Sequence, residues 1–233
     1  MSKPVCAVVG VGPGNGAAFA RRFNDEGYAV ALLARGTTYS EELAASLDGA
    51  IAYGCDVTNG EAVASTFKSI TRDLGDVEVL LYNAGSGVFG SIEELDGQAF
   101  ENAWRVNTLG AVHCAKQVIP AMKARGEGNI VFTGATASLR GGARFAAFAS
   151  AKASQRNLAQ SMARHLGPAG IHVSLVIVDG VIDLPRTRAM MADKSDDHFL
   201  APDDIADVVY HLTQQNKSAW TFELDVRPFG ESW

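Results

Sequence analysis

The chain has 233 residues, of which 47% are hydrophobic and 20% are charged, and its formal net charge is −6. These proportions are ordinary for a globular protein, and a chain of this length often folds as one α/β domain. The negative charge gives no electrostatic reason to expect nucleic acid or an anionic membrane as a partner, and no apolar run is long enough to span a bilayer. The cysteines Cys6, Cys55 and Cys114 lack metal or redox spacing, so we expect reduced, buried thiols in a cytoplasmic protein.

Short apolar runs alternate with longer helical patterns from the start of the chain. Seven runs are predicted as strands: Cys6–Gly10, Tyr28–Ala34, Ala50–Gly54, Val77–Tyr82, Asn129–Thr133, His172–Val178 and Thr221–Val226. Several are apolar throughout, which is typical of strands covered on both faces. The repeated strand-then-helix order predicts a doubly wound parallel sheet, a Rossmann fold, as a single domain over residues 1–233.

Local signals mark where the intervening helices begin and end. The Thr58-x-x-Glu61 pattern predicts a capping box, and Pro202 predicts a helix start. Gly27 and Gly75 stand where helices are expected to stop. The segment Asp183–Leu200 is the most irregular, so we expect a lid or binding loop in which Met190, Met191 and Phe199 give the pocket an apolar lining.

A glycine-rich turn joins the first strand to the first helix. Gly10, Gly14 and Gly16 follow the spacing G-x-x-x-G-x-G, whereas Asn15 occupies the third glycine position of the commoner G-x-G-x-x-G. Glycines allow a tight turn and a close approach of backbone to a pyrophosphate, and a helix N-terminus offers free N–H groups. The turn therefore predicts a nucleotide site.

Several further motifs, in order from about Val5 to Val226, resemble those of the short-chain dehydrogenase/reductase family of the classical type. They are Cys55–Thr58, Tyr82–Gly85, the stretch 105–110 with Asn107, and Val178–Asp183; Val9, Tyr82 and Asp179 depart from the residues usual in the family. The resemblance implies a Rossmann-fold oxidoreductase that binds a pyridine nucleotide. It implies cofactor contacts at Gly10, Gly14, Asn15, Gly16, Arg35, Asp56, Val57, Asn83, Ala84, Gly85, Lys152, Gly180 and Ile182.

The end of the second predicted strand bears on the choice of cofactor. An acidic residue there would bind the ribose hydroxyls of NAD, whereas an arginine favours the extra phosphate of NADP. The chain has Ala34 followed by Arg35. We expect NADP(H), with NAD(H) as the less favoured cofactor; the alternative is that Arg35 is a solvated loop charge.

The catalytic set that the resemblance implies has four members: a serine that orients a carbonyl, a tyrosine that transfers a proton, a lysine that lowers the tyrosine pKa and holds the nicotinamide ribose, and an asparagine that anchors a water linked to the lysine. Only Asn107 and Lys152 match. Phe148 occupies the tyrosine position and Ala135 the serine position, and the chain has no tyrosine between Tyr82 and Tyr210. A phenyl ring cannot donate a proton, so the acid–base set is incomplete.

Other groups near these positions could supply a proton or orient a substrate. Thr136 and Ser138 follow the same predicted strand, while Ser150 would point away from Lys152 on a helix. Asp179 could act as a carboxylic acid beside an apolar pocket. The alternative is that Asp179 caps a turn or pairs with one of Arg140, Arg144, Arg186 and Arg188. The histidines show no ligand spacing, and we predict no metal site.

The sequence is compatible with three functions: an NADP(H)-dependent oxidoreductase with a depleted acid–base set, a non-catalytic NADP(H)-binding sensor or partner subunit, and an enzyme of other chemistry on the same fold. The first is favoured because the glycine turn, Asn83, Asn107 and Lys152 together resemble a working cofactor pocket. The family packs subunits through the helices here expected at Ala99–Arg125 and Ala146–Leu166, which implies a homodimer or homotetramer. The tail Arg227–Trp233 would dock on a neighbouring subunit or cover its own core.

Overall fold

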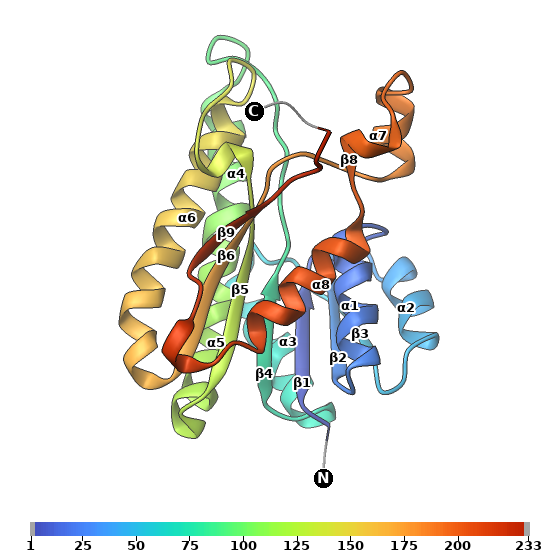
Figure 1. The fold of residues 1–233 in the computed structure, drawn as a ribbon. Helices are drawn as coiled ribbons and strands as arrows, with labels where there is room; N and C mark the ends of the chain where they lie inside the picture. The colour runs from blue at the N-terminus through green and yellow to red at the C-terminus, as the bar shows by residue number, and fades with distance from the viewer. Residues whose placement is uncertain (1–2, 231–233) are drawn as a thin grey trace.

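The structure, a computed structural model, describes residues 3–230. Seven parallel strands form one twisted sheet in the order β3-β2-β1-β4-β5-β6-β9 (Figure 1). Their bounds are Val5–Val9 (β1), Ala29–Ala34 (β2), Ile51–Gly54 (β3), Val77–Tyr82 (β4), Gly128–Ala135 (β5), Ile171–Val178 (β6) and Glu223–Val226 (β9). Each predicted strand is confirmed, with ends shifted by a few residues at most.

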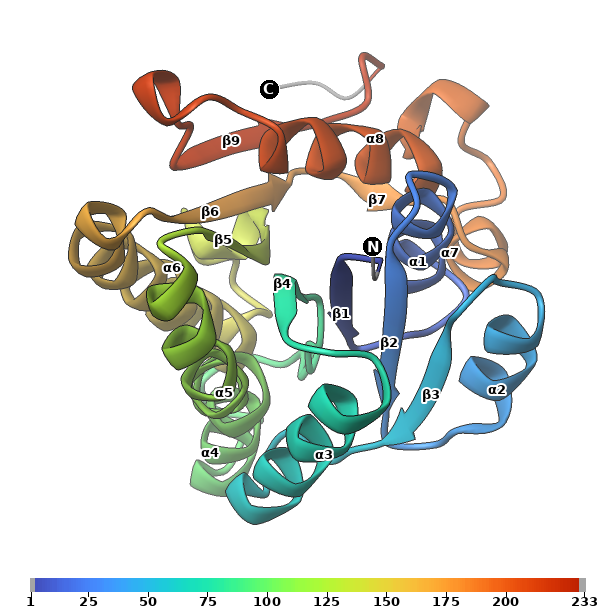
Figure 2. The same cartoon turned by 90° about the horizontal axis from the view of Figure 1, so that it is seen from below.

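Helices cover both faces of the sheet, as Figure 2 shows: α3, α4, α5 and α6 lie on one side, and α1 and α8 on the other. The bounds are Asn15–Asp25 (α1), Thr38–Ala45 (α2), Gly60–Asp73 (α3), Gly97–Trp104 (α4), Gly110–Arg125 (α5), Ala146–Leu166 (α6), Pro185–Met190 (α7) and Pro202–Thr213 (α8). Two separate groups of buried apolar side chains fill the spaces on the two faces. The doubly wound Rossmann fold in a single domain is therefore confirmed.

The carboxyl ends of β1 and β4 meet at the switch point of the sheet. β1 pairs with β2 on one side and with β4 on the other, and Val9 is level with Leu33 and Tyr82. The chain then leaves β1 and β4 in opposite directions, toward α1 and toward the segment before α4. Open α/β sheets bind ligands at such a crevice.

The helix between residues 97 and 125 is interrupted by one π-helical turn, Arg105–Leu109 (η1), which joins α4 to α5. The N–H of Gly110 donates to the carbonyl of Arg105, five residues earlier. Such insertions are frequent at functional sites. This one contains Asn107.

The predicted capping box before α3 is wrong. Asn59 caps this helix, and its side-chain oxygen accepts from the N–H groups of Glu61 and Ala62 at 3.0 and 3.1 Å. The hydroxyl of Thr58 is occupied elsewhere, because it donates to Asp56. The predicted helix start at Pro202 is confirmed, and Gly27 and Gly75 follow the ends of α1 and α3 with positive φ values of 88° and 115°.

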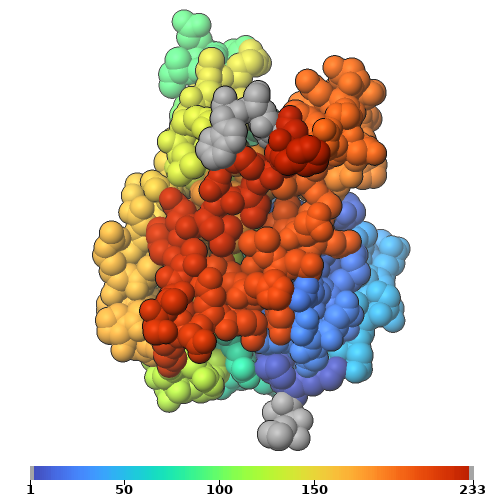
Figure 3. Space-filling view, in the orientation of Figure 1, coloured from blue at the N-terminus to red at the C-terminus, as the bar shows by residue number. Residues whose placement is uncertain are grey.

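The segment 183–200 is not the irregular loop that we expected. It contains α7, the 3-10 turn Asp196–His198 (η4), and the strand Phe199–Leu200 (β8), which pairs with Val181–Ile182 (β7). Figure 3 shows it as a lobe that rises beside the carboxyl end of the sheet. We expected Met190 to line the pocket, but its side chain is 79% exposed and does not do so. Phe199 is buried under the guanidinium of Arg188.

Candidate functional site

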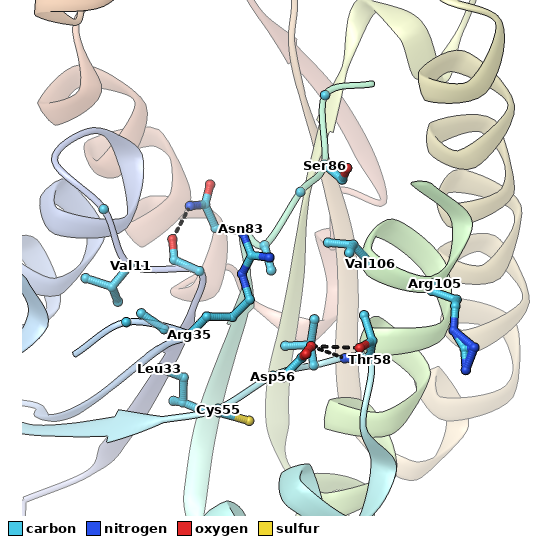
Figure 4. Close-up of a pocket in the computed structure, with 18 of the residues that line it drawn as sticks. Val11, Leu33, Arg35, Cys55, Asp56, Thr58, Asn83, Ser86, Arg105 and Val106 are labelled. Atoms are coloured by element: carbon cyan, nitrogen blue, oxygen red, sulfur yellow. Dashed lines mark hydrogen bonds between the residues drawn. The ribbon is translucent and has the colours of Figure 1, made fainter. Parts of the chain in front are cut away.

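A cleft of about 1120 Å³ opens at the carboxyl ends of the central strands (Figure 4). Its walls come from the turn after β1, the ends of β2 and β3, the segment after β4, and the end of α4 with η1. The lining residues are Gly10, Val11, Gly12, Leu33, Ala34, Arg35, Gly36, Cys55, Asp56, Val57, Thr58, Asn83, Ala84, Gly85, Ser86, Gly87, Asn102, Arg105 and Val106.

The floor of the cleft is held by bonds between the two turns that follow β1 and β4. The side-chain amide of Asn83 donates to the carbonyl of Gly10 at 2.8 Å, and its backbone N–H donates to Val9 at 2.9 Å. Gly10 has a φ of +93°, and a β-carbon there would lie 2.5 Å from the backbone of Ala84. Only glycine therefore fits at this point, where the two turns touch.

The start of α1 is arranged to receive an anion. A β-carbon at Gly16 would lie 2.6 Å from the carbonyl of Gly10, so this helix begins in direct contact with the turn. Within residues 3–230, the buried Oδ1 atom of Asn15 has no hydrogen-bond partner, and the first turn of α1 carries no acidic residue. Free N–H groups and the helix dipole at such a terminus favour a phosphate. Leu184 lies against Gly14 at the other side of this turn.

Arg35 and Asp56 stand at the outer part of the cleft, where Figure 4 shows the Arg35 side chain extending over it. One oxygen of Asp56 accepts from the N–H and the hydroxyl of Thr58 at 2.9 and 2.8 Å. These bonds, with a smaller contribution from the charge of Arg35, lower the pKa of Asp56. An anchored carboxylate and a guanidinium thus face one space, which suits hydroxyl and phosphate groups of a ribose.

Lys152 and Asn107 lie behind the inner end of the cleft. A β-carbon at Gly85 would lie 3.4 Å from Asn107 Oδ1 and 3.9 Å from Lys152 Nζ. The side-chain nitrogen of Asn107 donates to the carbonyls of Ala103 and Ser86 at 2.9 and 3.2 Å, which leaves buried Oδ1 without a partner among the described residues. A buried acceptor of this kind is available to a ligand or a water.

Lys152 is buried and makes two hydrogen bonds. Its ammonium donates to the carbonyl of Thr133 at 2.7 Å and to Oε1 of Gln155 at 3.1 Å. Burial lowers the pKa of Lys152 to about 8, because the charged form loses its hydration. Lys152 is therefore not a solvent-exposed lysine of the helix surface.

Phe148 precedes Lys152 by one helical turn and belongs to a group of three phenyl rings. The centroids of Phe89 and Phe148 are 5.6 Å apart, and those of Phe89 and Phe145 are 5.2 Å apart. Phe89 is 59% exposed. The ring at position 148 therefore borders an apolar surface that is open to solvent.

Asp179 is a buried, paired carboxylate rather than an isolated acid. Arg227 lies 2.8 Å from one oxygen, and the other accepts from the Thr136 hydroxyl at 2.5 Å, with Arg140 at 3.9 Å. Of the four arginines considered from the sequence, Arg140 is a partner, whereas Arg144 pairs with Glu94, and Arg188 pairs with Asp183 and Asp196. Asp179 therefore takes part in ion pairs, which is the structural alternative that the sequence raised for it.

The remaining hydroxyls near Phe148 serve the backbone. Ser138 accepts from the N–H of Ala135 at 3.1 Å, and Ser150 donates to the carbonyl of Ala147 at 2.9 Å. Thr136 is used by Asp179. Ser138 and Ser150 thus bond to the backbone, whereas the Thr136 hydroxyl bonds to a side chain.

The predicted cofactor residues fall into two groups. Seven line the cleft: Gly10, Arg35, Asp56, Val57, Asn83, Ala84 and Gly85. Six others, together with Asn107, lie outside its walls: Gly14, Asn15, Gly16, Lys152, Gly180 and Ile182. Ile182 is part of β7 and packs on the core beside α8, and Asn107 and Lys152 lie just behind Gly85.

Sequence reasoning missed several residues of this region. Among them, Arg105 lines the cleft, Gln155 contacts Lys152, and Arg227 pairs with Asp179. Lys152 and Gln155 are three residues apart on a helix, a spacing that brings side chains together, so the sequence could have indicated their contact. The tail was expected to dock or cover the core; Phe229 is 90% exposed, and residues 231–233 lie outside the described part.

Between residues 3 and 230, no three or more His, Cys, Asp or Glu side chains are grouped as metal ligands. In the same range, every helix is too short or too polar to cross a bilayer.

Comparison with known proteins identifies the family. The short chain dehydrogenase family model matches residues 4–195. A curated relative, 2-(S)-hydroxypropyl-CoM dehydrogenase 3 of Xanthobacter autotrophicus, is 30% identical over 91% of this chain and 90% of its own.

Two solved structures are similar over nearly the whole chain. A short-chain dehydrogenase from Rhodopseudomonas palustris has 35% identity and a TM-score of 0.83, over 97% of this chain and 99% of the other. A metagenomic short-chain oxidoreductase in complex with NADP has 28% identity and a TM-score of 0.85, with 99% of both chains covered. The chain thus belongs to the short-chain dehydrogenase/reductase family.

Proposed function

We propose that this protein is an NADP(H)-dependent oxidoreductase in which the proton-transferring half of the catalytic set is replaced. The observation that carries the proposal is the contact of the turns after β1 and β4: a β-carbon at Gly10 or Gly16 would overlap neighbouring backbone, and Asn83 ties the two turns together beneath the cleft. The start of α1, where helix N–H groups and the helix dipole favour an anion and the first turn carries no acidic residue, supports binding of a pyrophosphate there.

The cleft residues have distinct roles in this proposal. Arg35 would bind the phosphate on the adenosine ribose, and Asp56 with Val57 would border the adenine. Asn83, Ala84 and Gly85 would line the path to the nicotinamide, whose ribose would be held by Lys152, with Gly180 and Ile182 on the far side. The NADP-bound metagenomic relative supports a pyridine nucleotide, while the preference for NADP(H) over NAD(H) rests on Arg35.

When bound, the nicotinamide supplies a hydride. The chain would position it: Lys152 and Asn107 both lie behind Gly85, and the phenyl rings of Phe148 and Phe89 would give the place of an acceptor an apolar border. Positioning alone lowers the activation free energy of such a reaction by several kcal/mol, whereas loss of a general acid lowers the rate by a factor of about 10²–10⁴. Turnover with acceptors that require a proton from the protein is therefore expected to be slow.

Titration of the purified protein with NADPH and NADH, followed by NADPH oxidation with carbonyls, quinones and imines, tests this function. We expect saturable binding with NADPH preferred, and turnover with part of the panel. Absence of binding at millimolar concentration of either nucleotide would refute it.

A second function is favoured by Phe148 and Ala135, which provide neither a proton nor a hydrogen bond to a carbonyl. It is a non-catalytic NADP(H)-binding protein that acts as a sensor or a partner subunit. Saturable binding without turnover across the panel would identify it. In either case we infer a cytoplasmic homodimer or homotetramer whose subunits pack through α5 and α6. Light scattering would measure the number of subunits.

A further inference from the structure

Gln155 fills the space between Lys152 and the backbone of Asn107. Its side chain is fully buried and lies one turn after Lys152 on α6. Its Oε1 accepts from Lys152 at 3.1 Å, and its Nε2 donates to the main-chain carbonyl of Asn107 at 2.8 Å. One carboxamide thus joins the ammonium to the π-helical turn.

In the catalytic set that the family resemblance implies, an asparagine anchors a water that links the lysine to solvent; here the Gln155 carboxamide links Lys152 to the main-chain carbonyl of Asn107. A water both donates and accepts, so it can pass a proton onward. A carboxamide has a fixed acceptor end and a fixed donor end, and it passes none. The other bond of Lys152 ends on the carbonyl of Thr133, which only accepts.

We propose that Gln155 is a positioning residue that closes the proton path of this site, so that the site serves hydride acceptors that need no proton from the protein. This proposal rests on the proposed NADP(H) function. An iminium ion is such an acceptor: the hydride forms a new C–H bond, the electron pair of the C=N bond moves to nitrogen, and a neutral amine and the oxidised nucleotide result without proton transfer.

The surface next to Lys152 fits an acceptor of this charge. Phe148 is four residues before Lys152 on the same helix face, and Phe89 and Phe145 extend its ring into an aromatic surface. Aromatic faces attract cations. A planar organic cation can therefore lie on Phe148 where a neutral ketone would find no hydrogen-bond donor.

The first test compares acceptors on the unmodified protein. NADPH oxidation is measured with a cyclic iminium and with the ketone of matching shape. We expect the iminium to react at least about a hundredfold faster. Reduction of the ketone needs a general acid, whose absence lowers the rate by a factor of about 10²–10⁴, whereas reduction of the iminium needs none. Equal rates for the two would overturn the proposal.

The second test restores the missing groups with Phe148→Tyr and Ala135→Ser, and then adds either Gln155→Ala or the matched control Gln155→Met. The alanine leaves room for a water, whereas methionine fills the same volume without bridging. We expect ketone reduction to rise about tenfold or more with Gln155→Ala, with a new pH dependence and a solvent isotope effect, and not with Gln155→Met. If Gln155→Ala does not increase ketone reduction in the doubly substituted protein, Gln155 does not close the proton path.

A third measurement needs no variant. In the NADPH complex, NMR follows solvent exchange of the Gln155 side-chain amide protons, with exposed Gln98 as the internal reference. We expect exchange at least about a hundredfold slower for Gln155; equal exchange would overturn the proposal. Because NADPH binding is titrated on the same sample, a protein that binds no nucleotide refutes the proposed function separately.

Discussion

The hydroxyl of Tyr82 donates a hydrogen bond of 2.5 Å to the main-chain carbonyl of Val106. In a regular α-helix this carbonyl would accept from the N–H of Gly110, which donates to Arg105 instead. Tyr82 is buried at the end of β4, and a β-carbon at Gly110 would overlap its hydroxyl. The tyrosine that departs from the family motif therefore supports the π-helical turn that carries Asn107.

We expect Tyr82→Phe to lower the free energy of unfolding by about 1–3 kcal/mol, because it leaves a buried carbonyl without its donor. Urea denaturation measures this change. Tyr53→Phe is the matched control: its hydroxyl bonds to Asp73 at 3.2 Å near the surface, so its effect is expected within about 0.5 kcal/mol. Equal effects of the two substitutions would show that the Val106 bond has no special weight.

Gly10→Ala tests the contact between the turns. Its positive φ and the clash with Ala84 predict a loss of about 3 kcal/mol or more in unfolding free energy, together with loss of NADPH binding. Gly12→Ala is the control in the same turn, because a β-carbon there meets no atom within 4 Å. Thermal unfolding and nucleotide titration check both; a Gly10→Ala protein as stable as Gly12→Ala would contradict the geometry.

Arg35→Ala tests the cofactor preference. If Arg35 binds a phosphate, its removal lowers the binding free energy of NADPH by about 1.5–3 kcal/mol. Kd for NADPH then rises roughly 10- to 100-fold, while Kd for NADH hardly changes. Arg21→Ala removes an equal charge from α1, where the arginine pairs with Asp203, and should alter neither Kd. Tighter binding of NADH than NADPH by the unmodified protein would refute the assignment.

Lys152 predicts a pH dependence of stability. Its pKa is about 8 in the folded protein, against the ordinary lysine value of 10.5 that applies to the unfolded chain, so the unfolded chain binds more protons between these values. Stability therefore rises with pH across this window. The cost of the buried charge is complete below about pH 8 and is relieved as pH approaches 10.5.

Lys152→Met removes this contribution. Relative to it, the unmodified protein should gain up to a few kcal/mol between the two ends of the window, since one pKa unit is worth about 1.4 kcal/mol. Urea denaturation of both proteins at the two pH values measures the difference. Lys68→Met on the exposed side of α3 controls for the loss of one positive charge. A pH-independent difference would mean that Lys152 stays charged when buried.

Local pattern was enough to predict the architecture. Strand β6, for example, is buried over all of Ile171–Val178, and its apolar run indicated this directly. The turn at Gly10 could also be predicted, because only glycine tolerates the positive φ and the close approach of the Ala84 backbone found there. These features depend on neighbours in sequence or on backbone chemistry alone.

Contacts between distant segments were decided by packing. Gln155 reaches the carbonyl of Asn107 because α6 lies beside the π-helical turn, and nothing local in either segment specifies that meeting. In the same way, the sequence offered four arginines to Asp179 but not Arg227, which β9 brings to the end of β6. The sequence by itself predicted the Rossmann fold and shows phenylalanine at position 148, whereas the tertiary structure decided what surrounds Lys152, because side-chain partners depend on how helices and strands meet in space.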